Sequence, residues 1–381
     1  MRLGTILTEG TCLGIALVTS RPLGNAMYFT IRTSNVGLAD QLRQLEKLHA
    51  LGTALGYRYL HTPLADSCHN YRGEILDDFL GLGIGELRWP QSPGRDDQLV
   101  NVNFAAILPG ASITQDIDAT HRALTAVYGE SPDTVYRFCY QWRQRTRLVA
   151  AHKLSLRFPF FTKYWQRRNQ QPMASPFRDA PLKIAVHIRK GDRARLVYKG
   201  RHACNGRFID EHDPTHPHVP VSAYRSLIQR LLDRFSAEKV SFYVFSDGYQ
   251  ATFNRLSRLA TSSADREELL SLRERHEREL LALGSLPGVR LVVAEDEESM
   301  CAAIHACATC DLLIRDVGAF SRDCFHRFNR RPGARVFTLP QQQQLPLLTY
   351  CGSLLEMGAD TASAAFPAAR PRSARQPPDP R

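Results

Sequence analysis

The stretch Val186-His187-Ile188-Arg189-Lys190-Gly191-Asp192 closes an apolar run that begins at Leu182. Short apolar runs that end in a turn signal are typical of buried parallel strands, and ligands of open α/β sheets bind outside the carboxyl ends of such strands. The guanidinium of Arg189 is a planar fork that can bind phosphate oxygens through two parallel hydrogen bonds, and Gly191 allows a sharp turn. The stretch therefore predicts a phosphate site at a strand end. There His187 would donate to the anion or to a ribose, and Asp192 would orient Arg189 or accept a proton.

Strands and helices alternate through the rest of this half of the chain. Strands are predicted over 182–188, 240–245, 289–293, 311–314 and 335–338, and helices over 221–235, just after 247, 261–283, 297–308 and 320–328. This alternation predicts a doubly wound, mostly parallel sheet with helices on both faces.

The N-terminal half begins with the same pattern. A β-rich run over 27–32 is followed by leucines at three- and four-residue spacing from Leu38 to Leu55, which predicts a helix with one buried face. Gly56 ends the helix, and 57–61 predict the next strand. This βαβ unit predicts a second parallel sheet. Farther along, we expect 116–168 to be mostly helical, and we interpret the apolar stretch 12–18 as an edge strand.

A chain of 381 residues fits two domains better than one core. A Pro-rich stretch at 172–181 predicts a hinge near residue 175. We expect an N-terminal domain over 1–175, a C-terminal nucleotide-binding domain over 176–345, and a C-terminal segment over 346–381 that is disordered from about residue 367. Ligands would bind in a cleft between the two domains.

The formal net charge of +11 and a pI of about 9.4 suit an anionic partner, which could be a nucleotide diphosphate, a nucleic acid or an anionic membrane surface. No apolar run approaches the roughly 20 residues of a membrane span. Nine cysteines without the dense spacing of a disulfide scaffold favour a reduced, cytoplasmic compartment. Cys301, Cys307 and Cys310 could hold zinc, but no second ligand pair is evident nearby, which favours buried core thiols.

Three other stretches have a functional and a plain interpretation. Asp116-Ile117-Asp118 matches the Asp-x-Asp metal signature, although acidic residues in a first helical turn are ordinary, and we predict no metal. The basic and aromatic stretch 142–168 favours a solvated helix pair with an aromatic core over a peripheral contact with an anionic membrane. Nucleic acid is not expected, because no recognised nucleic-acid-binding module accompanies this stretch.

The segment 193–220 is basic and predicts a loop over the cleft. It carries four histidines for which solvation is favoured over metal binding: His202, His212, His216 and His218.

The pattern His-x-Arg-x-Gly-Asp at 187–192 resembles motif I of the α1,2-, α1,6- and protein O-fucosyltransferases. Phe245-Ser246-Asp247-Gly248 is similar to motif II of this family, and Ala319-Phe320-Ser321-Arg322 to motif III. The stretch 36–42 looks like the Gly-rich first turn of the bacterial nodulation fucosyltransferases. The resemblance covers about residues 27–60 and 182–338.

The resemblance implies an α/β protein of the GT-B fold, with two Rossmann-like doubly wound domains facing a central cleft. It implies a bacterial, metal-independent, inverting glycosyltransferase that needs no cofactor. The enzyme would move fucose from the nucleotide sugar GDP-fucose to a hydroxyl of a glycan or glycolipid, in the cytoplasm or at the periphery of the inner membrane. Catalytic roles fall to Arg189, Asp192 and Asp40. The residues implied to bind the nucleotide sugar are His187, Arg189, Gly191, Ser246, Asp247, Phe320, Ser321, Arg322, Asn35 and Gly37.

The sequence departs from the family at one informative place. Ala303 stands where these enzymes usually carry an Asp that pairs with guanine, so His305 or backbone groups would have to read the base. A GT-B transferase with a different nucleotide sugar is therefore an alternative, and so is a non-catalytic protein that binds sugar nucleotides or nucleic acid. The catalytic base is open among five acids, of which the first is preferred: Asp192, Asp40, Asp210, Glu211 and Asp213.

Overall fold

The computed structural model describes residues 27–89, 98–107, 117–129, 134–139, 157–191, 194–210, 219–294, 296–316, 318–329, 331–339 and 344–361. These fall into two compact units. The first unit takes its described residues from 1–31, 47–60 and 87–156, and the second from 32–46, 61–86 and 157–381. The expected boundary near residue 175 would divide the chain into continuous segments, whereas each unit combines several segments of the chain. The boundary stays a prediction. The expected strand over 12–18 and the expected tail from 367 lie outside the described residues.

The second unit is built on a parallel sheet with the strand order β11-β10-β6-β12-β13. The strands are β6 (Leu182–Ile188), β10 (Val240–Ser246), β11 (Val289–Val293), β12 (Leu312–Arg315) and β13 (Arg335–Thr338). The chain runs outward from β6 through β10 to β11 and then crosses back to β12 on the other side of β6. The predicted strands and the α/β fold class are confirmed, and the crossover between β6 and β12 marks where such sheets bind ligands.

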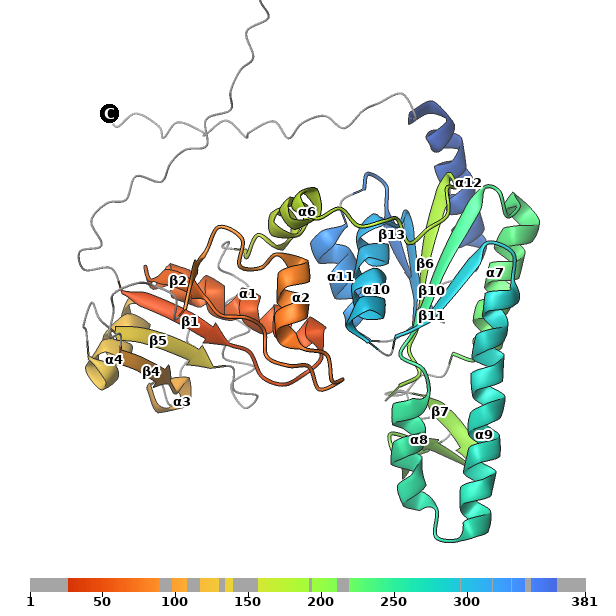
Figure 1. Ribbon diagram of the computed structural model, residues 1–381, viewed down its shortest axis with the longest axis horizontal. Helices are drawn as coiled ribbons and strands as arrows, with labels where there is room; N and C mark the ends of the chain where they lie inside the picture. The colour runs from red at the N-terminus through yellow and green to blue at the C-terminus, as the bar shows by residue number, and fades with distance from the viewer. Residues whose placement is uncertain are drawn as a thin grey trace, which may run out of the picture. The chain divides into compact units, whose positions relative to one another are not determined.

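Helices cover both faces of this sheet, with α10 and α11 on one side and α7 and α12 on the other (Figure 1). The helices are α7 (Val221–Phe235), α8 (Gln250–Leu256), α9 (Ser263–Leu281), α10 (Glu297–Thr309), α11 (Phe320–Phe328) and α12 (Gln344–Thr361), with 3-10 turns η3 (Ser257–Leu259) and η4 (Ala282–Ser285). This cover explains why every residue of β10 is buried. The predicted helices are confirmed; α12 was not predicted.

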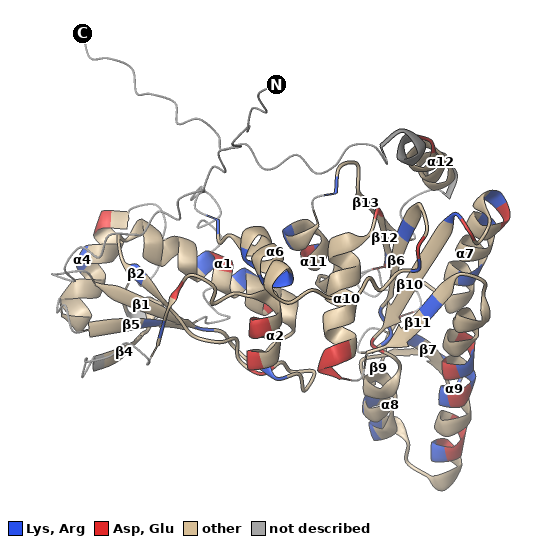
Figure 2. Cartoon of the chain, turned by 45° about the horizontal axis from the view of Figure 1, so that its top comes forward, with Lys and Arg blue, Asp and Glu red and all other residues tan. Residues whose placement is uncertain are grey.

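The ends and surfaces of these helices follow local sequence rules. Capping boxes start α9 at Ser262 and α10 at Asp296, where the cap side chain accepts a hydrogen bond from the third backbone N–H of the helix. Acidic and basic side chains alternate along α9 (Figure 2), as expected of a solvated helix.

The prediction of a loop over 193–220 is wrong for 195–208. These residues form an antiparallel sheet of β7 (Arg195–Tyr198), β8 (Arg201–Cys204) and β9 (Arg207–Phe208). Its two turns are Lys199-Gly200 and Asn205-Gly206, and all four residues have positive φ, as a tight hairpin turn requires. His202 pairs with Arg195, whose Nε donates to Nδ1 at 3.2 Å. The other three histidines of the stretch lie outside the described residues.

Three helices from the N-terminal half pack within the second unit. They are α2 (Gly73–Leu80), α6 (Phe160–Gln170) and the residues of α1 (Leu38–Ala54) up to Glu46. On α6, Tyr164 is buried, and Trp165 donates from Nε1 to the carbonyl of Phe328 at 2.9 Å. The aromatic core expected for the basic stretch is thus present on α6, while its part over 142–156 lies outside the described residues.

The first unit has its own sheet, with the order β3-β2-β1-β5-β4. Its strands are β1 (Tyr28–Arg32), β2 (Arg58–His61), β3 (Leu87–Arg88), β4 (Gln98–Val102) and β5 (Thr134–Cys139), with helices α3 (Phe104–Ile107) and α4 (Ile117–Tyr128). β1 pairs with β2 in parallel, which confirms the predicted βαβ unit. The mostly helical prediction for 116–168 is wrong at β5, whose β-branched and aromatic residues suit a strand that pairs with β4.

The three cysteines considered for zinc lie in ordinary core positions. Cys301, Cys307 and Cys310 are buried free thiols, and burial raises the pKa of each, which confirms the interpretation as core thiols. Asp118 lies in the first turn of α4, while Asp116 is outside the described residues. Within the described ranges, no cluster of three or more His, Cys, Asp or Glu side chains is placed to hold a metal, and no helix is long and apolar enough to span a membrane.

Candidate functional site at the crossover of the second sheet

The strands on either side of the crossover end next to each other. β6 and β12 are paired in parallel, with His187 opposite Arg315 at the carboxyl edge. Arg189 follows β6, and Asp316 follows β12, the strand next to β6 in the sheet. The edge that general topology marks for ligand binding therefore carries two arginines, a histidine and a carboxylate.

His187 joins the first predicted motif to the other two. Its ring stacks on Phe245 with centroids 4.8 Å apart and meets Phe320 edge-on at 5.8 Å. Its Nδ1 lies 3.0 Å from the hydroxyl oxygen of Ser321. Burial, and then the charges of Arg189 and Arg315, lower the pKa of His187 to about 3, so the ring is neutral near pH 7. When Ser321 donates to Nδ1, Nε2 carries the proton and is the ring's donor.

Arg189 is half-buried and lies beside Gly318. Its backbone N–H donates to Oδ2 of Asp316 at 3.3 Å. A Cβ built on Gly318 would lie 2.7 Å from Nη1 of Arg189, and Gly318 has a φ of 122°, which side-chain-bearing residues rarely adopt. The bare backbone of Gly318 therefore leaves room for the guanidinium at the crossover.

Asp247 holds the turn that follows Arg189. Its Oδ1 accepts hydrogen bonds from the backbone N–H groups of Lys190 at 2.6 Å and Gly191 at 2.8 Å. A Cβ on Gly191 would lie 2.5 Å from Oδ2 of Asp247, so the glycine is needed for this approach. Next to it, the buried hydroxyl of Ser246 accepts from the backbone N–H of Gly248 at 3.1 Å. The second motif thus fixes the backbone of the first, a role that sequence reasoning did not assign to Asp247.

Sequence reasoning also missed charged groups beneath this edge. Arg315 is 6% exposed and donates to two backbone carbonyls, those of Asp316 from Nε at 2.9 Å and Gly318 from Nη1 at 2.8 Å. Burial raises the pKa of Asp316 to about 6, against the opposing charge of Lys190. Lys190 is itself buried and donates from Nζ to the carbonyl of Val219 at 2.5 Å. The sequence did contain a signal for Arg315. It is the last residue of β12, and Arg189 is likewise the first residue after β6.

Two ion pairs tie the first helix to α11, the helix that carries Ser321. Arg43 donates from Nε and Nη2 to the two carboxylate oxygens of Asp323, at 2.6 and 3.0 Å. One turn along, Arg327 donates to Oε2 of Glu46 at 2.6 Å. Because both pairs join residues 32–46 to α11 within the second unit, the Gly-rich turn is fixed relative to the third motif.

Asp40 belongs to this network at its exposed side. Nη1 of Arg43 donates to Oδ1 of Asp40 at 3.1 Å, and the Asp40 side chain is half-exposed. The turn before it is held by Gln41, which donates to the carbonyl of Val36 at 3.1 Å. Asn35 is exposed, and Gly37 is half-buried with the ring of His69 nearby. Arg322 is half-exposed on α11.

The remaining candidates lie at undescribed, exposed or buried positions. Asp192, the preferred base, lies outside the described residues, as do Glu211 and Asp213. Asp210 is exposed. The alternative reader of the base, His305, is 5% exposed, and its Nδ1 lies 2.7 Å from the hydroxyl of Tyr164. This buried contact argues against a direct role in base recognition.

The chain was compared with known proteins. No protein-family model and no curated protein matches it. Among solved structures, the fucosyltransferase NodZ from Bradyrhizobium is 12% identical, with 82% of this chain and 96% of that chain covered and a TM-score of 0.32. POFUT1 in complex with GDP-fucose is 11% identical, with 84% and 98% covered and a TM-score of 0.38. A mutant of Arabidopsis thaliana FUT1 in complex with GDP is 11% identical, with 83% and 71% covered and a TM-score of 0.37. At identities and TM-scores this low, the assignment of function has to rest on the chain's own residues.

Proposed function

We propose that this chain is an inverting, metal-independent glycosyltransferase that moves fucose from GDP-fucose to a hydroxyl of a glycan or glycolipid. The observation that carries the proposal is the meeting of three sequence motifs at the β6–β12 crossover. There, His187 contacts Ser321 and the stacked Phe245, and Arg189 follows directly on β6. All three motifs supply residues to the carboxyl edge, where open α/β sheets bind ligands.

The charges at this edge suit a nucleoside diphosphate. In the proposed reaction, the acceptor oxygen attacks the anomeric carbon while the bond from that carbon to the diphosphate oxygen breaks. Negative charge then grows on the leaving diphosphate, and fixed donors that face this charge lower the barrier. Arg189 and the hydroxyl of Ser321 would hold the diphosphate, and Arg315 adds positive potential from below. The neutral His187 would supply a hydrogen bond rather than a charge.

The proton of the acceptor hydroxyl has to pass to a base. We keep Asp192 as the proposed base and Asp40 as the second choice. Asp40 is half-exposed and connected through Arg43 to Asp323 on α11, so it lies on the same face of the first helix as the residues that fix the third motif. Asn35 and Gly37 would shape the acceptor side of the site.

A second candidate function is a transferase of the same fold with a different nucleotide sugar. It is favoured by α10, where Ala303 is 1% exposed and His305 is engaged with Tyr164. Neither offers the carboxylate with which fucosyltransferases are expected to pair guanine. Backbone groups would then read the base.

A nucleotide-release assay tests the proposal. Purified full-length protein is incubated with GDP-fucose, other GDP-sugars, UDP-sugars and CDP-sugars, with and without oligosaccharide acceptors. We expect GDP release from GDP-fucose, no loss of activity in EDTA, and loss of activity in Arg189→Ala. Release from a UDP- or CDP-sugar alone would select the second candidate. No release from any donor, together with tight and steeply salt-dependent binding of oligonucleotides, would favour a non-catalytic binding protein.

A further inference from the structure

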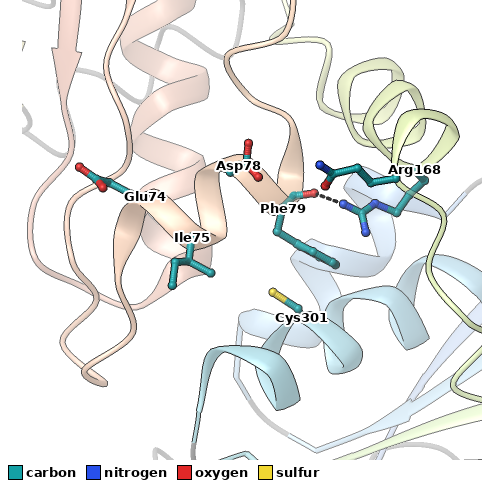
Figure 3. Close-up of a pocket in the computed structure, with 7 residues that line it drawn as sticks. Glu74, Ile75, Asp78, Phe79, Arg168 and Cys301 are labelled. Carbon is teal, nitrogen blue, oxygen red and sulfur yellow. Dashed lines mark hydrogen bonds between the residues drawn. The ribbon is translucent and has the colours of Figure 1, made fainter.

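A pocket of about 380 Å³ opens within the second unit between α2, α6 and α10 (Figure 3). On α2, the wall is made by residues spaced one turn apart, Glu74 with Asp78 and Ile75 with Phe79, so one face of this helix lines the pocket. Cys301 of α10 lies across from them. This volume is ordinary for a pocket that holds a small ligand.

Arg168 of α6 is the unusual member of the wall. It is 9% exposed, and its guanidinium lies over the ring of Phe79 at 4.2 Å and donates from Nη2 to the Phe79 carbonyl at 2.9 Å. Its Nε has no hydrogen-bond partner among the described residues. Nε is covered by protein atoms, so a ligand in the pocket would be bound through the remaining N–H groups of the Arg168 guanidinium.

The charges around the pocket select the kind of ligand. Glu74 and Asp78 are exposed carboxylates, and Oδ2 of Asp78 accepts a hydrogen bond from the guanidinium of Arg167. Gln171 adds a carboxamide, and Arg168 is the cation among the residues that line the pocket. The carboxylate of Glu74 disfavours a phosphate or carboxylate ligand, and the buried guanidinium of Arg168 disfavours a cation. A neutral polyol satisfies both, because each hydroxyl can donate to a carboxylate and accept from a guanidinium or an amide. Ile75 and Phe79 offer apolar surface to the carbon face of a sugar ring.

The pocket is connected to the crossover site through a series of hydrogen bonds. The backbone N–H of Ala294 donates to the carbonyl of Ser246 at 2.7 Å, and the Tyr71 hydroxyl donates to the Ala294 carbonyl at 3.2 Å. The next residue, Arg72, donates from its backbone N–H to Oε1 of Glu297 at 3.1 Å, directly before α2 begins. The start of α2 is therefore fixed at the same carboxyl edge as the second motif.

The pocket is separate from the face of α10 that matches the family's base-reading position. Cys301 and Ala303 are two residues apart, which is about 200° around an α-helix. The two residues therefore face opposite sides of α10, and the pocket does not coincide with that position.

We propose that this pocket is a saccharide subsite that holds sugar units of the acceptor away from the reacting hydroxyl. The inference rests on the proposed function. It assigns Glu74, Asp78, Arg168 and Gln171 to the hydroxyls of a neutral oligosaccharide, and it makes the pocket a determinant of acceptor choice and affinity.

Two variants and one matched control test the pocket in the full-length chain. Gln171→Trp fills the pocket from an exposed position, and Glu74→Gln removes one acceptor charge from an exposed helical position. Gln170→Trp places the same bulk one residue earlier, on an exposed residue that does not line the pocket. Saturation-transfer NMR with lactose, N-acetyllactosamine, cellobiose and maltotriose, together with a printed glycan array, measures saccharide binding. GDP release without an acceptor measures the donor site independently.

We expect at least one of these saccharides to bind wild type and Gln170→Trp alike, and Gln171→Trp to abolish its binding. Loss of a hydrogen bond to a charged group in Glu74→Gln should weaken binding about tenfold. Donor hydrolysis should stay unchanged in all three variants. If no saccharide on the array or in solution binds wild type, or if Gln171→Trp binds as wild type does, the pocket is not a saccharide subsite. Absence of donor hydrolysis in wild type would contradict the proposed function instead, so the two failures are distinguishable.

Discussion

Replacement of Asp247 by alanine removes the hydrogen bonds that shape the turn after Arg189. Oδ1 of Asp247 accepts from two consecutive backbone N–H groups, those of Lys190 at 2.6 Å and Gly191 at 2.8 Å. Hydrogen bonds to a charged group contribute about 1.5–3 kcal/mol each. Asp247 is half-buried, so water can replace part of this contribution in the variant. We therefore expect Asp247→Ala to lower the free energy of unfolding by about 2–4 kcal/mol.

The same change should reach the anion site without direct contact. Once the N–H groups of Lys190 and Gly191 are released, the backbone beside Arg189 loses its fixed conformation, and the preorganisation of the guanidinium is lost with it. We expect GDP to bind about tenfold more weakly to Asp247→Ala. Asp247→Asn keeps an oxygen that can accept both N–H groups and should recover at least half of the lost stability, because neutral hydrogen bonds contribute about 0.5–1.5 kcal/mol each.

Urea unfolding followed by tryptophan fluorescence measures the stability, and calorimetric titration with GDP measures the affinity. The matched control is Asp233→Ala on α7, whose exposed carboxylate accepts only from Gln229 on the same helix, at 2.8 Å, among its described contacts. Its effect should stay below about 0.5 kcal/mol. The reasoning is refuted if Asp247→Ala unfolds at the same urea concentration as wild type while GDP binding is lost. Asp247 would then contact the nucleotide directly and would not hold the turn.

Three further changes test other parts of the structure. Gly318→Ala puts a Cβ against Arg189 and strains a backbone with a φ of 122°, so we expect GDP affinity to fall about tenfold by calorimetry. Burial lowers the pKa of His305 from 6.5 to about 4. As the pH falls, the unfolded chain therefore binds a proton at a higher pH than the folded chain does. The stability contributed by His305 is fully present above pH 6.5 and is lost as the pH falls toward 4. That shift corresponds to about 3 kcal/mol, and urea unfolding of His305→Phe should show a flatter pH profile than wild type. Arg43→Ala leaves the buried carboxylate of Asp323 without its bidentate partner. We expect this change to lower the free energy of unfolding by about 2 kcal/mol in the same assay.

Matched changes separate these effects from general damage. Gly56→Ala also strains a positive φ, of 80°, but meets nothing within 4 Å, so it should lower stability and leave GDP affinity unchanged. Arg266→Ala removes an exposed arginine from α9 and should change stability by less than about 0.5 kcal/mol. Equal losses of GDP affinity in Gly56→Ala and Gly318→Ala, a pH profile unaltered in His305→Phe, or equal stability in Arg43→Ala and wild type would contradict the corresponding argument.

The second sheet was predictable because its signals are local. Each of its strands is a short apolar run, and the helices that follow begin at residues such as Ser262 and Asp296, whose side chains cap them. The small sheet β7–β9 was missed because strands of two to four residues give too few alternations to read, although Asn205-Gly206 is a strong hairpin signal. β5 was missed because basic residues around it concealed its β-branched and aromatic run.

The site was predictable only as far as motif residues extend. Arg189 and Ser321 stand out because each follows a predicted strand, and strand ends converge in a parallel sheet. The pairing of Arg43 with Asp323 joins residues 280 positions apart and carries no local signal. The contact of Asp247 with the backbone of Gly191 is equally invisible in sequence, because it depends on the register between β6 and β10.

Calorimetric titration of the full-length protein with GDP, UDP and CDP tests the central claim most directly. We expect GDP to bind most tightly of the three nucleotides. Arg189→Ala should weaken the binding of GDP by about ten- to a hundredfold, because it removes a hydrogen-bonded charge at a phosphate. Equal GDP affinity in wild type and Arg189→Ala would contradict a diphosphate site at the β6–β12 crossover. Tighter binding of UDP or CDP than of GDP would leave the site in place and exclude GDP-fucose as the donor.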